Sequence, residues 1–230
     1  RINDVDQETD YRLMGEVAEK FNQIAVRREH ILGNHDVAFL TNEDNETLLN
    51  ATVRSRSFIL DDWHFIFWSP DTRYSSQSGF PEDDKAVEWL GAALDQHSGP
   101  TILFCHVPQV TGNLDGNYWF ENNPWAAVLP YNKRVLNILA DHPGIQMTVG
   151  GHIHWPRLNT LNGTHHITLP SIIEGFFSAG NACGLWTEII ISDNLTVNIT
   201  GSQNWEWKLP LREYGHKWPA PRKSSRQTAS

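Results

Sequence analysis

The sequence predicts an α/β sandwich with helices on the outside and two mixed β-sheets inside. Segments with a helical spacing of apolar residues alternate with strand-like runs through the first 150 residues, which is typical of α/β folds. Three later strand-like runs follow one another without helices between them, which indicates an antiparallel end. The chain has 230 residues, 40% of them hydrophobic and 20% charged, and this suits one globular domain with a sizeable core.

The N-terminal part predicts a helix followed by a strand. In residues 6–23, apolar side chains recur every three or four positions and acidic residues come first, as helix N-termini favour. Residues 25–32 predict a strand, and the order of helix and strand indicates a βαβ layout. Residues 36–50 are polar and predict a loop or a short helix.

The middle of the chain predicts two strands, a helix and a further strand. Residues 57–60 and 64–68 form a hairpin or two adjacent strands in this interpretation. Residues 81–97 predict a helix with a proline in its first turn, and residues 101–105 predict a strand. Residues 108–130 form a long loop rich in Asn, Gly and Trp, and loops of that length are usually functional or disordered.

The C-terminal part predicts a helix over residues 131–141 and then a strand that ends at Gly150. The three strand-like runs mentioned above are residues 164–169, 185–191 and 195–200. The hydrophobic pattern fades after the last of them. We therefore predict a domain over residues 1–201 and a C-terminal extension over residues 202–230, with a disordered end from residue 219.

Charge and composition exclude several classes of protein. The formal net charge is −9 and no dense basic run precedes the C-terminal tail, which argues against general nucleic-acid binding. No apolar run reaches the roughly 18 residues that a membrane-spanning helix needs. Cys105 and Cys183 are too few for a disulfide framework, and we expect both to be reduced and buried. Five Asn-x-Thr sequons suit a secreted glycoprotein or arise by chance, so localisation stays open.

Three separated motifs carry the polar residues that point to chemistry. They are Gly33-Asn34-His35-Asp36, Phe104-Cys105-His106-Val107-Pro108 and Gly150-Gly151-His152-Ile153-His154. Each follows a β-branched or apolar run, so each is expected where a buried strand gives way to a loop, and all three are expected to meet at one edge of the sheets. His152 and His154 would share one face of a strand, and the glycines before them would permit a close approach of the backbone.

These residue types suit metal binding. Asn34 offers an amide oxygen, and His106, His152 and His154 offer imidazole nitrogens, which are ligands that first-row divalent metals accept. His35 has the side chain expected of an acid or base that works near neutral pH. Taken one motif at a time, ordinary loop residues would explain each of them. Asp36 could simply form the turn.

The order and content of the motifs resemble the calcineurin-like metallophosphoesterase superfamily. Its pattern runs Asp-x-His, Gly-Asp-x-x-(Asp/Asn), Gly-Asn-His-(Asp/Glu), a lone His and Gly-His-x-His. The last three blocks are present and the first two are not, although Asn3 would fit the final place of the second block. The resemblance implies a four-layer α/β/β/α sandwich that is N-terminally truncated. The spacing of the blocks is most similar to the branch with cyclic-nucleotide phosphodiesterases and related small-substrate phosphatases.

The resemblance also implies a dinuclear centre with two divalent or mixed-valence ions, of Mn, Fe, Zn or Co. Asn34, His106 and His152 would bind one ion and His154 the other. A metal-bridging hydroxide would attack phosphorus while His35 protonates the leaving oxygen. The resemblance implies that Asp36 holds His35 in position. The absent blocks would supply the bridging carboxylate, so we expect this chain alone to bind at most one ion well and to hydrolyse phosphoesters weakly.

The motifs do not identify the substrate. The resemblance implies a small phosphomonoester or phosphodiester, and a nucleotide is one candidate. The aromatic residues of the long loop, Tyr118, Trp119, Phe120 and Trp125, could stack on a base or sugar, or they could cap the hydrophobic core. A second hypothesis is a catalytically inactive binding or scaffold module on the same fold. Nothing in the sequence predicts the oligomeric state.

Overall fold

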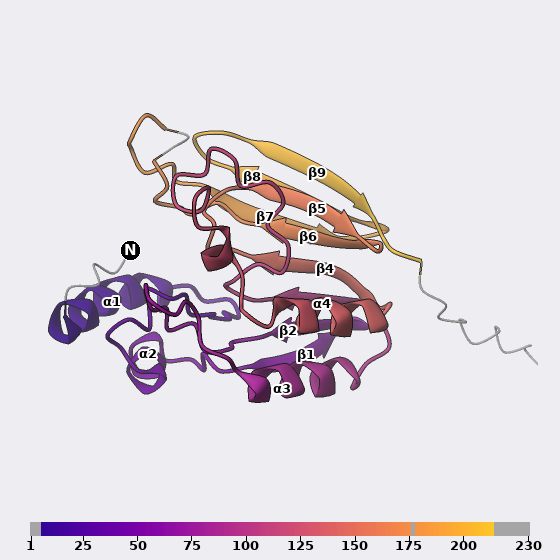
Figure 1. Cartoon of the computed structure of the whole chain (residues 1–230), viewed down its shortest axis with the longest axis horizontal. Coiled ribbons are helices and arrows are strands. Elements are labelled where there is room, and N and C mark those ends of the chain that lie inside the picture. Colours follow the sequence, from indigo (N-terminus) through magenta and orange to yellow (C-terminus); the bar gives the residue numbers. More distant parts are fainter. Residues whose placement is uncertain (1–5, 176–177, 214–230) are drawn as a thin grey trace, which may run out of the picture.

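The computed structural model describes residues 6–175 and 178–213 of the chain. Nine strands form two sheets in this part of the chain, and the larger has the strand order β1-β2-β3-β4-β6-β5 while the smaller has the order β7-β8-β9 (Figure 1). The predicted α/β class with two sheets is confirmed, although only the larger sheet is mixed and the smaller one is antiparallel throughout. No helix in the described ranges is long and apolar enough to cross a membrane.

The elements follow one another from α1 to β9. The helices are α1 (Gln7–Phe21), α2 (Asn42–Leu49), α3 (Asp84–Leu94), the 3-10 helix η1 (Pro124–Ala127) and α4 (Asn132–Asp141). The strands are β1 (Arg56–Leu60), β2 (Trp63–Phe67), β3 (Thr101–Phe104), β4 (Ile145–Gly150), β5 (Arg157–Leu161), β6 (Thr164–Thr168), β7 (Trp186–Ile191), β8 (Asn194–Thr200) and β9 (Trp205–Pro210).

Four neighbouring strands of the larger sheet, β2, β3, β4 and β6, run parallel to one another. The edge strands β1 and β5 are antiparallel to their neighbours. The carboxyl ends of the four parallel strands therefore meet at one edge of the sheet, where open α/β sheets place their ligands.

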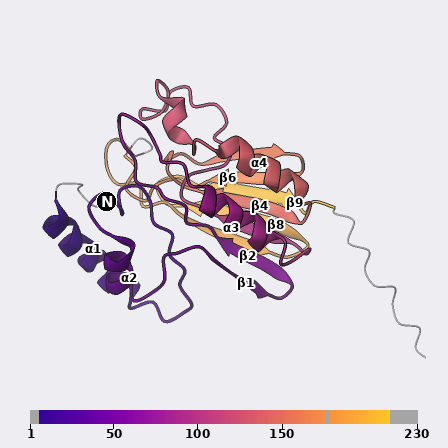
Figure 2. The same cartoon turned by 60° about the horizontal axis from the view of Figure 1, so that its bottom comes forward.

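Two layers of core hold the sheets in place. Helices α3 and α4 cover one face of the larger sheet, and the smaller sheet covers the other (Figure 2). Strand β3 shows the alternation, because Leu103 packs toward the helices and Ile102 packs toward the smaller sheet. All six residues of β4 are buried, as expected of a central parallel strand.

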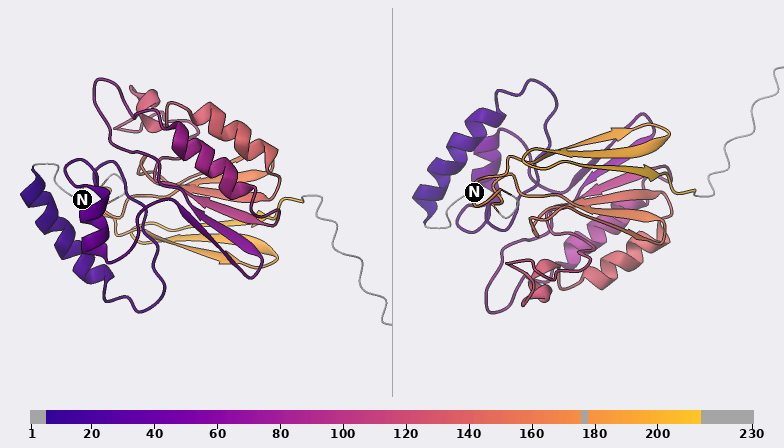
Figure 3. Two further views of the ribbon diagram at one scale, coloured as in Figure 1. Left: turned by 90° about the horizontal axis from the view of Figure 1, so that it is seen from below. Right: turned by 90° about the horizontal axis from the view of Figure 1, so that it is seen from above.

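The outer face of the smaller sheet carries no helix within residues 6–175 and 178–213 (Figure 3). Helices α1 and α2 instead lie at one end of the sheets, where Met14 and Ala18 pack with Leu49 and Val53 in a separate cluster. The layers seen in the described part of the chain are therefore helix, sheet and sheet. The predicted second helix layer is not among them.

One predicted element of the N-terminal half is wrong, and another begins later than predicted. Residues 25–32 form no strand, because no other strand of the described chain pairs with them and a β-run needs a ladder partner. They are held by side chains instead, with the Arg56 guanidinium donating to the His30 carbonyl at 2.9 Å and contacting Glu29 at 2.6 Å. Helix α3 begins after Asp83, whose carboxylate caps it, so Pro81 lies outside the first turn.

The C-terminal third also differs from the prediction. Strand β6 is parallel to β4, and its antiparallel partner β5 was not predicted at all. Strand β9 pairs with β8, so the sheet extends past the predicted boundary at residue 201. Trp205, Trp207 and Leu209 pack against the sheet core and alternate with the polar residues Glu206 and Lys208, a period of two that is typical of a strand and that the prediction did not use. The predicted disordered end, residues 219–230, lies outside the described residues.

Candidate metal centre

A cavity of about 420 Å³ gathers the motif residues at the carboxyl edge of the parallel strands. Its lining includes Asn34, His35, His106, His152 and His154. His106 follows β3, while His152 and His154 follow the neighbouring parallel strand β4, so the topology places them side by side. The predicted meeting of the three motifs is thus what the structure shows, although Asp36 does not line this cavity.

Two glycines allow the segments to approach each other. A Cβ atom on Gly33 would lie 2.6 Å from Cε1 of His106, and a Cβ atom on Gly150 would lie 2.8 Å from Cα of Pro108. Neither position can carry a side chain without a shift of the neighbour. A Cβ atom on Gly151 would meet nothing closer than 3.9 Å, so the expectation of close approach holds for Gly150 and not for Gly151.

His152 and His154 do not lie on a strand, which corrects the sequence interpretation. Both follow the end of β4, and both have a left-handed backbone, with φ of 59° and 62°. The backbone reverses here because Ile153, between them, is fully buried beside Leu114. The Ile153 carbonyl also accepts a hydrogen bond of 3.0 Å from the amide of the buried Asn117. The two rings are thus aimed by a strained turn rather than by strand alternation.

The amide oxygen of Asn34 lies between two imidazoles. Its Oδ1 atom is 3.0 Å from Nε2 of His106 and 3.2 Å from Nδ1 of His152. The other nitrogen of His152, Nε2, lies 2.9 Å from the Ala126 carbonyl, which can only accept, so Nε2 carries the proton. The Nδ1 lone pair then faces the Asn34 oxygen. Two facing acceptors fit a cation that would bind to both of them.

The protonation states also suit metal binding. Burial lowers the pKa of His106 well below its ordinary value, and the nearby imidazoles of His152, His154 and His35 lower it further. Burial likewise lowers the pKa of His152 to about 4. Both imidazoles are therefore neutral near pH 7, which is the form that a metal ligand requires.

A carboxylate that the sequence analysis missed lies beside His154. The Oε2 atom of Glu174 is 3.1 Å from Nδ1 of His154. Glu174 belongs to the segment after β6, the next parallel strand beyond β4. Its only signal in the sequence is an acidic residue shortly after a strand-like run, which is too weak to select it.

His35 and Asp36 face different sides of their turn. His35 lines the cavity, whereas Asp36 accepts a hydrogen bond of 2.7 Å at Oδ2 from the backbone N–H of Gly33. The Asp36 N–H in turn donates to the Gly33 carbonyl at 3.0 Å. These contacts support the turn-forming role for Asp36, and its contribution to the position of His35 stays a prediction.

The side chains at this site could supply three ligands to one metal ion, but they give an incomplete set of ligands for a second ion. Asn34, His106 and His152 converge, while His154 stands nearby with Glu174 behind it. Within residues 6–175 and 178–213, no group of three His, Cys, Asp or Glu side chains is arranged to hold a metal ion. A set of three ligands therefore has to include the amide of Asn34. Burial raises the pKa of the Cys105 thiol to about 12, and Cys105 packs in the core beneath the helices, so it is no ligand.

The aromatic residues divide between the two roles that the sequence left open. Trp119 and Trp125 line the cavity with 46% and 52% of their surface exposed, and Tyr74 joins them from the loop after β2. Phe120 also lines the cavity, but it is 8% exposed and packs with Ile153 and its neighbours, so it is a wall of the cavity and a cap of the core at once. Tyr118 does not line the cavity and is 81% exposed.

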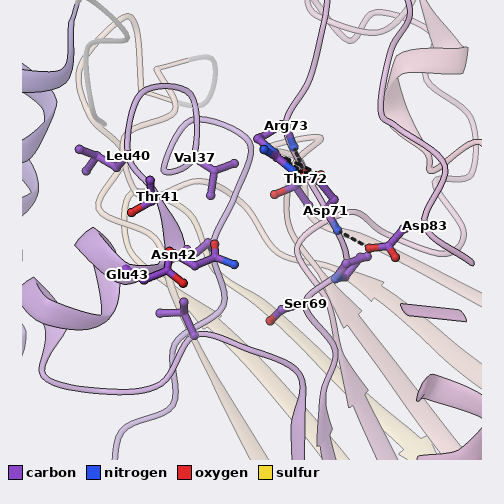
Figure 4. Close-up of a pocket in the computed structure, with 13 residues that line it drawn as sticks. Val37, Leu40, Thr41, Asn42, Glu43, Ser69, Asp71, Thr72, Arg73 and Asp83 are labelled. Carbon is purple, nitrogen blue, oxygen red and sulfur yellow. Dashed lines mark hydrogen bonds and ion pairs between the residues drawn. The ribbon is translucent and has the colours of Figure 1, made fainter. Parts of the chain in front are cut away.

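A second cavity of about 380 Å³ lies between the start of α2 and the segment after β2 (Figure 4). The Asp71 carboxylate is bonded there to the Arg73 guanidinium, and the backbone N–H of Asp71 donates to the Asp83 carboxylate at 3.0 Å (Figure 4). Asp71 and Arg73 pair with each other, whereas Asp83 accepts from backbone N–H groups and Glu43 pairs with Arg54 outside the cavity. This cavity contains none of the predicted site residues and no imidazole, so the first cavity is the candidate metal centre.

No protein-family model matches the sequence, and no curated protein sequence matches it. A dimetal phosphatase from Danio rerio has a similar structure, with a TM-score of 0.67 and 14% identity over 90% of this chain and 81% of that one. Weaker likenesses are GAP50, described as the anchor in the inner membrane complex of Plasmodium (TM-score 0.47, 15% identity, 70% and 54% covered), and a candidate 5′-nucleotidase from Staphylococcus aureus (TM-score 0.42, 13% identity, 86% and 40% covered). The first likeness shows a metallophosphoesterase-like fold.

Proposed function

We propose that the chain is a metal-dependent hydrolase of phosphoester bonds. One observation carries the proposal. An amide oxygen and two neutral imidazoles converge through Asn34 Oδ1, in a cavity at the carboxyl ends of neighbouring parallel strands. The fold, which resembles that of a dimetal phosphatase, supports the same conclusion.

Asn34, His106 and His152 would hold one ion, and His154 would contribute to a second. When bound, such ions polarise a phosphoryl oxygen and lower the pKa of water at the site. The ligand set of imidazole and amide suits Mn, Fe, Zn and Co alike. The chain's own contribution is to keep these imidazoles neutral and to hold them on a rigid edge of the sheet.

His35 is proposed as the catalytic acid. Its ring lines the cavity beside the ligand histidines, so it can reach the oxygen of a leaving alcohol bound there. An imidazole can carry a proton near neutral pH and deliver it as the bond to phosphorus breaks. Asp36 would act indirectly, by fixing the turn that carries His35.

The substrate is proposed to be small and to carry a flat ring, as a nucleotide does. A cavity of about 420 Å³ holds a small molecule and not a polymer. Trp119 lies with its ring centre 6.3 Å from that of His154, so its exposed face borders the position of the phosphoryl group. Phosphomonoesters and phosphodiesters both fit this description.

The test combines elemental analysis with hydrolysis of p-nitrophenyl phosphate and its bis-ester. His35→Asn should lower turnover by at least about 100-fold, the usual contribution of a catalytic acid, while metal content is unchanged. His97→Asn, on the far side of the domain from the cavity, is the matched control and should retain activity. Activity that survives His35→Asn, or that persists after complete metal removal, would contradict the proposal.

The alternative of a catalytically inactive binding module has one observation in its favour, the incomplete ligand set for a second ion in the described part of the chain. The same experiment separates the two. Metal binding without hydrolysis of either ester would favour the module. Two tightly held ions with high turnover would contradict the expectation that this chain binds only one ion well.

A further inference from the structure

Glu174 contacts the ring of His154 but does not itself line the cavity. Its carboxylate is 3.1 Å from Nδ1 of His154, and the two side chains are 13% and 27% exposed. His154 lines the cavity and Glu174 does not. The carboxylate therefore contacts the ring at Nδ1 without being part of the cavity wall.

Backbone hydrogen bonds hold Glu174 and the residues before it. The Ser171 N–H donates to the His154 carbonyl at 3.3 Å, which ties the segment after β6 to the Gly-His-x-His motif. The Glu174 N–H donates to the Ser171 carbonyl at 3.1 Å, and the Glu174 carbonyl accepts from the Cys183 N–H at 3.1 Å. Because β6 runs parallel to β4, both segments leave the sheet at the same edge. The contact between the two side chains thus follows from the topology.

The contact decides which nitrogen of His154 carries the proton. An ionised carboxylate only accepts hydrogen bonds, so Nδ1 must donate and the lone pair lies on Nε2. His152 has the opposite arrangement, since its Nε2 donates to the Ala126 carbonyl at 2.9 Å and its Nδ1 faces Asn34. Two histidines that are two residues apart would therefore use different ring nitrogens toward the same cavity.

We propose that Glu174 is a positioning residue that holds His154 in the Nδ1–H tautomer and turns its Nε2 toward the second metal position. The proposal rests on the proposed metal-dependent function and adds to it a residue outside all three motifs. The negative charge of Glu174 would also raise the basicity of the His154 ring, which matters most where an ion has few protein ligands.

Metal affinity gives the first test. Calorimetric titration with Mn²⁺ or Zn²⁺ should show the weaker of two binding events fall about 10- to 100-fold in Glu174→Ala, with a smaller loss in Glu174→Gln and no change in the tighter event. Glu121→Gln, an exposed carboxylate of the long loop, is the matched control. Equal isotherms for Glu174→Ala and Glu121→Gln would overturn the proposal.

The tautomer gives a second test that needs neither metal nor activity. Long-range ¹⁵N–¹H correlation spectra of the metal-free protein should show His154 protonated at Nδ1, and a mixture of tautomers in Glu174→Gln and Glu174→Ala. Protonation at Nε2 in the unmodified chain would refute the assignment. If the unmodified chain bound no metal at all, the proposed function would fail, while the spectra would still decide whether Glu174 sets the tautomer.

Discussion

The direction of each proposed ligand side chain depends on the backbone conformation at a few residues. His152 and His154 both have φ near +60°, a conformation that is uncommon outside Gly although Asn, Asp and His adopt it more often than other residues, and it costs of order 1–3 kcal/mol each. The buried side chain of Ile153 holds this conformation. Gly33 affects the direction of another side chain. Because it has no side chain of its own, the His106 ring can lie against its backbone.

Gly33→Ala should displace the His106 ring, since the new Cβ would lie 2.6 Å from Cε1. We expect metal affinity to fall about tenfold or more and stability to fall by about 1–3 kcal/mol from overpacking. Calorimetric metal titration and urea denaturation would measure the two effects. Gly151→Ala is the control, because its Cβ would be 3.9 Å from the nearest His106 atom. Equal losses in both variants would show that ring displacement is not the cause.

At the scale of elements, the long loop between β3 and α4 contains both buried and exposed aromatic residues. Phe120 packs with Ile153 of the Gly-His-x-His turn and also lines the cavity, and the more exposed Trp119 and Trp125 line it as well. Asn117, fully buried, joins the loop to the same turn through the Ile153 carbonyl. The loop is thus part of the support of the site as well as a wall of its cavity.

Phe120→Ala should lower the free energy of unfolding by about 3 kcal/mol, as expected for a large buried aromatic side chain. Trp119→Ala is the neighbouring comparison and should cost less, about 1 kcal/mol, because the side chain is 46% exposed and so buries only about half of its surface. Urea denaturation of both variants checks the difference. Similar losses in the two would mean that Trp119 is also a core residue.

Trp119→Ala should instead affect binding of the substrate. Stacking of an aromatic side chain on a base contributes roughly 1–3 kcal/mol, so KM for a nucleoside monophosphate should rise about tenfold or more. KM for glycerol phosphate, which has no ring to stack, should change little. Steady-state kinetics on both substrates make the comparison, and equal changes in KM would discredit the stacking idea.

Most elements with a clear apolar period could be predicted from the sequence, and those without one could not. Strand β9 is an exception, because its residues alternate between apolar and polar and the prediction did not use that period. Helices α1, α3 and α4 and strands β1 to β4 lie close to their predicted positions. Strand β5 was missed because its residues are intermediate or exposed at the sheet edge, and they show little apolar character. Over residues 25–32 the error is the opposite one, because a strand was predicted where the structure has none. An apolar run cannot reveal whether a partner strand lies beside it.

At the scale of the whole molecule, the site is a consequence of strand order. His106, the two histidines of the Gly-His-x-His motif and Glu174 follow β3, β4 and β6, three adjacent parallel strands. The sequence could place the motifs at strand ends, and therefore at one edge. The sequence could not reveal that β6 is the neighbour of β4, so Glu174 was not predicted as a residue of the site. The ring nitrogen used by each histidine likewise depends on partners distant in the sequence.

The parallel sheet also contains a buried histidine that makes folding sensitive to acid. His166 on β6 is 3% exposed and its Nδ1 lies 2.8 Å from the Thr148 hydroxyl on β4. Burial lowers the pKa of His166 from 6.5 to about 4, with a smaller contribution from the nearby His165. In the unfolded chain the pKa returns to about 6.5. Below that pH the unfolded state binds a proton that the folded state does not.

The stability that His166 contributes is therefore complete above about pH 6.5 and is lost as the pH falls toward 4. At pH 5 the loss from this group should be about 2 kcal/mol, as an order of magnitude. Urea denaturation in the presence of a chelator, at pH 7.5 and pH 5, measures it. The buried His106 and His152 shift stability in the same direction, so the comparison is with His166→Asn, which retains a hydrogen-bonding side chain opposite Thr148. The variant should lose less stability than the unmodified chain between the two pH values, and equal losses would mean that His166 is charged in the folded protein or solvated within it.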